Sequence, residues 1–109
     1  MKNEQIAQAF FYGQTARTEN LFIEDKNGIK IIYSYGRHFP IAIKFSDGYL
    51  FNSDGYSNTT ARHKNLVLSY IKSELADEDF LNTIKLKSVV DKIKYGDIKT
   101  KAEFIEQKI

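Results

Sequence analysis

The chain has 109 residues, of which 42% are apolar and 28% charged, which is the composition expected of one soluble domain with a modest core. Its net charge of +2 is too small to indicate a nucleic-acid or acidic partner by itself. The absence of Cys excludes disulfides, thiolate nucleophiles and zinc–thiolate sites. No apolar run approaches the ~20 residues that span a bilayer, and no signal peptide is recognisable. We therefore expect a cytoplasmic protein with no membrane partner.

The first half of the chain predicts a short helix and then a β-hairpin. Apolar residues recur at helical spacing within residues 3–12. Asn27-Gly28 then separates two runs rich in β-branched and aromatic residues, and it predicts a type I′ turn because both turn positions need positive φ. In that register Asp25 faces Lys30 across the strands.

A second hairpin follows directly. Residues 39–45 alternate between apolar and other positions, Asp47-Gly48 predicts another type I′ turn, and residues 49–52 return. The sole proline, Pro40, stands at the beginning of its strand, where its missing N–H does least harm. Together the hairpins predict a four-stranded antiparallel meander over about residues 21–52.

The second half predicts about three helices. Thr59 or Thr60 is expected to cap the first of them. The acids at 77–79 favour the first turn of the next helix, and the apolar residues of 80–93 fit either a helix or a strand, of which we choose the helix. A capping box at 100–103 predicts the last helix.

Residues 1–109 are thus expected to form a single α+β domain, in which an N-terminal helix and about three C-terminal helices pack on the meander. In such a meander both hairpin turns lie at one edge of the sheet. The opposite edge collects the entry to the first strand, the connection between the second and third, and the exit from the fourth. All three arginines and both histidines of the chain fall there, namely Arg17, Arg37, Arg62, His38 and His63.

The start of the helix after the fourth strand adds to this rim. Its free backbone N–H groups and the positive end of the helix dipole favour anions, and arginine matches the planar geometry of phosphate or carboxylate. Tyr35, Phe39 and Tyr56 supply flat surfaces nearby. The predicted anion or partner site comprises Arg17, Tyr35, Arg37, His38, Asn58, Thr59, Thr60, Arg62 and His63. Changing Arg37 and Arg62 together to Ala is expected to abolish binding.

Each of these residues also has an ordinary structural interpretation. Arginines at loop edges are usually solvated, His63 can pack or hydrogen-bond within the first helical turn, and strand aromatics usually belong to the core. The lysines of the last third of the chain alternate with Asp91, Asp97 and Glu103. This alternation favours a solvated helix surface over a non-specific phosphate-contacting face.

Motifs of catalysis are absent. The sequence contains no P-loop, no dinucleotide-binding glycine pattern, no HExxH and no GxSxG. His38 with His63 near Asp54 is the one constellation that the topology allows, and no nucleophile stands beside it at a diagnostic spacing. We therefore expect no catalytic residues, no metal site and no cofactor.

One stretch has a specific resemblance. Residues 34–42 read SYGRHFPIA, Asn52 follows, and residues 56–63 read YSNTTARH. This combination resembles a group of small uncharacterised proteins of phages and other mobile elements. The resemblance covers about 30 residues of the middle of the chain and implies a genomic setting without an activity.

The sequence therefore predicts a non-enzymatic, phage-type binding protein that recognises an anionic partner, either a nucleic acid or an acidic protein surface. The alternative is an inhibitor of a host protein such as a defence nuclease, of the anti-CRISPR or anti-restriction type, acting by protein–protein contact. A histidine-dependent phosphoryl-transfer or hydrolytic enzyme is a weaker alternative. A homodimer is also compatible with the sequence, since the meander leaves two edge strands.

Overall fold

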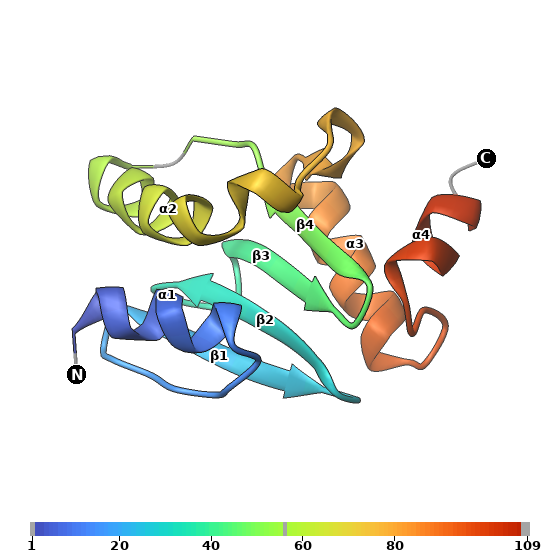
Figure 1. Ribbon diagram of the computed structural model, residues 1–109, viewed down its shortest axis with the longest axis horizontal. Helices are drawn as coiled ribbons and strands as arrows, with labels where there is room; N and C mark the ends of the chain where they lie inside the picture. Colours follow the sequence, from blue (N-terminus) through green and yellow to red (C-terminus); the bar gives the residue numbers. More distant parts are fainter. Residues whose placement is uncertain (1, 56, 108–109) are drawn as a thin grey trace.

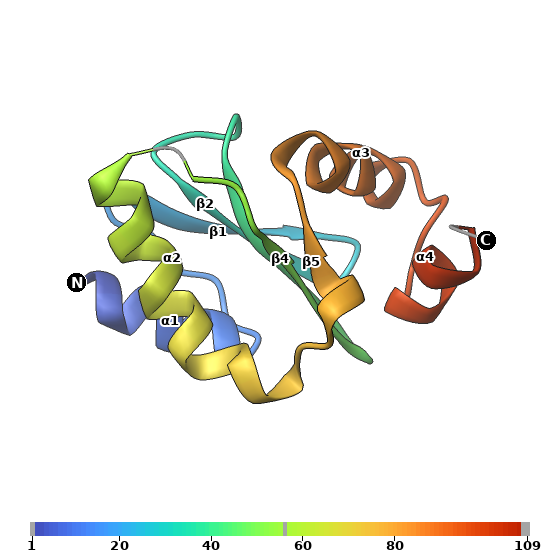
Figure 2. The ribbon, with the colours of Figure 1, turned by 90° about the horizontal axis from the view of Figure 1, so that it is seen from above.

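A mixed five-stranded sheet lies between two layers of helices in a computed structural model, which describes residues 2–55 and 57–107 (Figures 1 and 2). The α+β class predicted from the sequence is confirmed. The helices are α1 (Asn3–Phe11), α2 (Asn58–Ile71), α3 (Thr83–Lys94) and α4 (Lys101–Gln107), with 3₁₀ turns at Lys72–Glu74 and Asp77–Asp79. The strands are β1 (Leu21–Lys26), β2 (Ile29–Ser34), β3 (Pro40–Phe45), β4 (Gly48–Asn52) and β5 (Phe80–Leu81), and they stand in that order across the sheet.

The first hairpin has the predicted turn and register. Asn27 and Gly28 both have positive φ, at 57° and 86°, as a type I′ turn requires. Asp25 pairs with Lys30 across the strands, and their side chains form an ion pair. The predicted cross-strand contact is confirmed.

The second hairpin differs from the prediction in its turn. Phe45 pairs with Gly48, so the loop consists of Ser46 and Asp47, and Gly48 is the first residue of β4. Asp47 does not have positive φ, whereas Gly48 has φ 148°. The type I′ turn expected at Asp47-Gly48 is therefore wrong, and glycine serves the conformation that follows the turn.

A fifth strand was missed. Residues 80–81, expected in a helix, pair in parallel with Phe51 and Asn52 and extend the four-stranded meander at its β4 edge. The backbone N–H of Ser53 donates to the carbonyl of Leu81 at 2.7 Å. Helix α3 begins only after Asn82, whose side chain accepts from the Lys85 N–H. The open edge of β4 thus provides hydrogen bonds that outweigh the local helical pattern.

The two faces of the sheet carry separate cores. Helices α1 and α2 pack on one face, where the buried side chains include Phe10, Ile32 and Val67. Helices α3 and α4 cover the other face, where they bury Ile31, Leu50 and Leu86. Figure 2 shows the sheet between these pairs of helices. The expected C-terminal helices are therefore divided between the two faces.

Helix α2 begins two to three residues earlier than expected. Ser57 is its N-cap, and the Ser57 side chain accepts from the Thr60 N–H at 3.1 Å. Thr59 and Thr60, which the sequence predicted as caps, instead lie in the first helical turn. Within the described residues, no helix is both long and apolar enough to cross a membrane.

Candidate anion-binding site

The backbone segments of the predicted rim lie together in the structure. The start of β1, the end of β2, the start of β3 and the start of α2 all lie at one end of the sheet, on the left of Figure 1, opposite the hairpin turns. The antiparallel order of the first four strands produces this arrangement, as expected. The side chains of the rim nevertheless divide into a buried group and an exposed group.

The buried group is centred on His63. Its side chain and that of Thr60 point into the protein, and the two residues are only 3% and 1% exposed. The Nδ1 atom of His63 lies 2.7 Å from the hydroxyl of Ser34, which is itself 3.5 Å from the hydroxyl of Thr60. Thr60 and His63 therefore connect α2 to the end of β2 and do not face solvent.

Two further residues of this cluster were not predicted. The amide nitrogen of Asn3 lies 3.2 Å from Nε2 of His63, and the Asn3 oxygen accepts from the Thr18 hydroxyl at 3.0 Å. Because the Asn3 amide donates to Nε2, the ring proton is on Nδ1 and is donated to Ser34. These residues are far apart in the sequence and follow no motif, so no sequence signal identified the cluster.

Acid is expected to weaken the fold through His63. Burial lowers the pKa of His63 below its ordinary value of 6.5, so below pH 6.5 the unfolded chain binds a proton that the folded chain resists. Stability contributed by the neutral ring is complete above pH 6.5 and is lost as the pH falls towards the folded pKa, by at most about 1.4 kcal/mol per pH unit. Urea unfolding between pH 7.5 and 5 measures this slope. His63→Gln should reduce it and His38→Gln should not; equal slopes in both variants would disprove the assignment.

Tyr35 forms the exposed surface above this cluster. Its ring centroid lies 5.5 Å from that of His63, and Tyr35 is 47% exposed. The residue has φ 65°, and the Gly36 N–H donates to the Ser34 carbonyl around it at 2.8 Å. Positive φ is a genuine outlier for a bulky side chain and is found where function or tight packing requires it. The strained backbone therefore presents an aromatic ring to solvent.

The exposed group is centred on Phe22 and Glu24 of β1. The guanidinium of Arg37 donates from Nε and Nη2 to one oxygen of Glu24, at 2.9 Å for Nε. The guanidinium carbons of Arg17 and Arg37 lie 5.6 and 5.8 Å from the ring centroid of Phe22, within cation–π range. Strand β1 thus gathers two of the three arginines at its first half.

Glu24 is surrounded by positive charge. Its hydrogen bond from Arg37 lowers its pKa despite the opposing effect of burial, and the charges of Arg37, Lys26 and Arg17 lower it further. The other carboxylate oxygen, Oε1, is buried and has no hydrogen-bond partner among the described residues. One carboxylate therefore faces three cations.

Two hollows meet at the Glu24–Arg37 pair. The first, here called the Arg17 hollow, has a volume of about 320 Å³ and lies between residues 15–17 and the first half of β1. The second, here called the α3 groove, has a volume of about 270 Å³ and separates β1–β3 from α3, with Lys26, Lys87 and Lys94 in its walls. Tyr33 and Val90 provide apolar surface in the groove, and burial raises the pKa of Tyr33 to about 12, so its phenol stays neutral.

The charges of the two hollows do not balance. Five cationic side chains line them against two carboxylates, those of Glu24 and Asp91. Among the described residues, the Arg37–Glu24 pair is the one ion pair found there. We call the set Arg17, Lys26, Arg37, Lys87 and Lys94 the cationic face. The sequence identified Arg17 and Arg37 by topology. The lysines of α3 were interpreted as ordinary surface, because the sequence does not show that α3 faces β1 across a groove.

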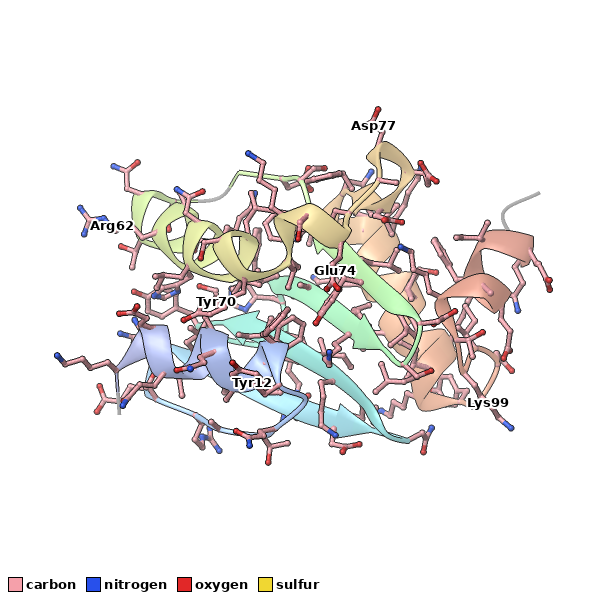
Figure 3. All side chains as sticks on the ribbon, viewed as in Figure 1. Tyr12, Arg62, Tyr70, Glu74, Asp77 and Lys99 are labelled. Atoms are coloured by element: carbon pink, nitrogen blue, oxygen red, sulfur yellow. The ribbon has the colours of Figure 1, made fainter. Side chains whose placement is uncertain are left out.

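The remaining predicted site residues are not brought into these hollows. Asn58, Thr59 and Arg62 are exposed on α2, and Figure 3 shows Arg62 extending away from the body of the molecule. The exposed residue His38 has its ring next to Gly36, since a Cβ added at Gly36 would lie 2.9 Å from His38 Nδ1. Tyr56 lies outside the described residues.

Asp54, which the sequence analysis placed near His38 and His63, makes a structural contact. The carboxylate of Asp54 accepts from the Thr83 N–H at 2.7 Å, at the start of α3. Over residues 2–55 and 57–107, no group of three or more His, Asp and Glu side chains could hold a metal ion.

Comparison with known proteins places the chain in a family. The sequence profile of a protein family of unknown function, DUF8033, matches residues 1–82. This range contains all five strands, α1, α2 and the stretch from 34 to 63 that carries the resemblance noted above; α3 and α4 follow it. No curated protein sequence and no solved structure matches the chain. The match covers about three quarters of the sequence, and the chain therefore belongs to the DUF8033 family of unknown function.

Proposed function

We propose that this protein is a non-enzymatic binding module whose partner is anionic and is contacted through the cationic face. The observation that carries the proposal is the excess of three positive charges in two adjoining hollows, on a chain whose net charge is only +2. A concave surface lined mainly by one sign of charge focuses the electrostatic field and raises the local concentration of ligands of the opposite charge. Of the exposed residues of the predicted rim, Arg17, Tyr35 and Arg37 belong to this surface or adjoin it.

The two arginines of the cationic face, Arg17 and Arg37, favour a phosphate or carboxylate group as the ligand. Arg17 forms no ion pair with a described residue. The two hydrogen bonds from Arg37 to Glu24 use only two of the five guanidinium N–H groups. A planar guanidinium beside an aromatic ring is held in orientation, which reduces the entropy lost on binding. The phage or mobile-element setting implied by the resemblance belongs to the same proposal, with a partner in the cytoplasm of a host cell.

The test measures binding to two simple polyanions by isothermal titration calorimetry, namely inorganic polyphosphate and poly-L-glutamate. Arg17→Gln/Arg37→Gln is compared with Arg62→Gln/Lys99→Gln, a control that removes the same charge at exposed positions that line neither hollow. We expect the first variant to lose about tenfold or more in affinity at low salt, since it removes two charge-assisted contacts, and the control to lose little. Equal losses in both variants, or no binding of either polymer by the unaltered protein, would contradict the proposal.

A further inference from the structure

The cationic face has the layout of a surface for a flexible chain of phosphates and bases. Resting on the proposed function, we infer that its partner is a single-stranded nucleic acid, with phosphates crossing the cationic face and bases stacked on Tyr35 and Tyr95. Two features of the surface support this partner, namely the spacing of the cations and the position of two exposed rings.

The cations are distributed along a path. Arg17 lies in the first hollow, Arg37 in the wall common to both, and Lys26, Lys87 and Lys94 in the second. A small anion would need only one of these places. A polymer with one charge per nucleotide occupies them all at once, and each neutralised phosphate releases counterions and adds to affinity.

Aromatic rings stand at both limits of this path. Tyr35 is held on the residues just before β1, because its N–H donates to the Asn20 carbonyl at 2.8 Å. At the other limit Tyr95 is 74% exposed, and its ring lies 6.0 Å from the ammonium of Lys94, which lines the α3 groove. Exposed rings beside cations are the elements from which single-strand sites are built, since every base can stack on them.

These rings distinguish single strands from other polyanions. The bases of a duplex are stacked on one another and leave nothing for Tyr35 or Tyr95, and the acidic side chains of a protein have no flat surface to place there. The negative charge of Glu24 is offset by Arg37.

The experiment is fluorescence anisotropy over a range of salt concentrations. The probes are a labelled mixed-sequence single strand of about 12 nucleotides, the same sequence as a duplex, and labelled poly-L-glutamate. Lys87→Gln/Lys94→Gln tests the phosphate path against Lys99→Gln as control. Tyr35→Asn removes the ring and introduces a residue type that tolerates positive φ. Tyr95→Ala is matched with Tyr12→Ala, which alters another largely exposed tyrosine that lines neither hollow.

We expect the single strand to bind more tightly than the duplex. The Lys87→Gln/Lys94→Gln variant should make the negative slope of log K against log salt shallower by about 1.4, as the loss of two phosphate contacts predicts. Each ring variant should lose about tenfold in affinity, while Tyr12→Ala and Lys99→Gln lose little. Binding of poly-L-glutamate without the single strand, or ring variants that bind normally, would overturn this inference and leave the proposed function standing. Failure of all three probes would overturn both.

Discussion

A chain that ends at Asn82 is expected to lose cooperative unfolding. The remaining residues keep the sheet, α1 and α2, but α3 and α4 no longer cover the second face. Ile31, Ile43 and Leu50 are completely buried there, and each loses about 1.5–3 kcal/mol when its side chain is returned to water. The sum over the sheet residues buried on this face is comparable to the 5–15 kcal/mol by which domains are usually stable.

Thermal unfolding followed by circular dichroism checks this result. A chain that ends at Thr100 is the matched control, because it keeps α3 and loses α4, with the contact of Phe104 and the ion pair between Lys101 and Asp79; it should unfold cooperatively at a lower Tm. The chain cut at Asn82 should show a broad transition and bind a hydrophobic dye. If it melted cooperatively within a few degrees of the intact protein, the second face would not depend on α3, and this account of the core would be wrong.

Replacing Lys101 by Met is expected to destabilise the protein by about 3 kcal/mol at neutral pH. The ammonium of Lys101 lies 2.7 Å from Asp79, whose side chain is only 2% exposed. Removing one partner of a buried ion pair leaves an uncompensated charge and costs 3–5 kcal/mol in comparable cases. The same residue begins α4, where its N–H and that of Ala102 donate to Asp47, and this contact is kept in the variant.

Chemical denaturation of Lys101→Met, Lys99→Met and the double variant Asp79→Asn/Lys101→Met separates the causes. Lys99→Met removes an exposed charge and should change stability by less than about 0.5 kcal/mol. The double variant should recover part of the loss, because its neutral amide can still accept the Ala76 N–H that Asp79 binds. A loss as large in the double variant as in Lys101→Met would show that packing of the lysine stem, and not the unpaired carboxylate, is responsible.

Local signals explain what the sequence predicted well. Asn27-Gly28 predicts a two-residue turn, because both residues readily adopt positive φ. A two-residue turn fixes which residues of the two strands face each other, so the pairing of Asp25 with Lys30 could be predicted correctly. The rim followed from topology, because antiparallel strands joined by tight turns must place their other connections together. The alternation of apolar residues at 39–45 was likewise sufficient to predict that β3 is a strand.

The predictions were wrong where contacts between residues far apart in the sequence determine the local structure or the burial of a side chain. Phe80 and Leu81 became a strand because the edge of β4 was free, which no local pattern of residues 80–93 records. His63 and Thr60 became core residues because Asn3, Thr18 and Ser34 come together around them. The α3 lysines come near the arginines only when α3 packs on the sheet, so their combined charge is a property of the tertiary structure.

Mapping amide chemical shifts during titration with an unlabelled single-stranded oligonucleotide tests the cationic face most directly. The largest changes are expected on Arg17, Lys26, Arg37, Lys87 and Lys94 and should saturate together, while the exposed side of α2 around Arg62 should be unaffected. Changes centred on the first turn of α2, or spread evenly over the lysines of the whole surface, would contradict this expectation.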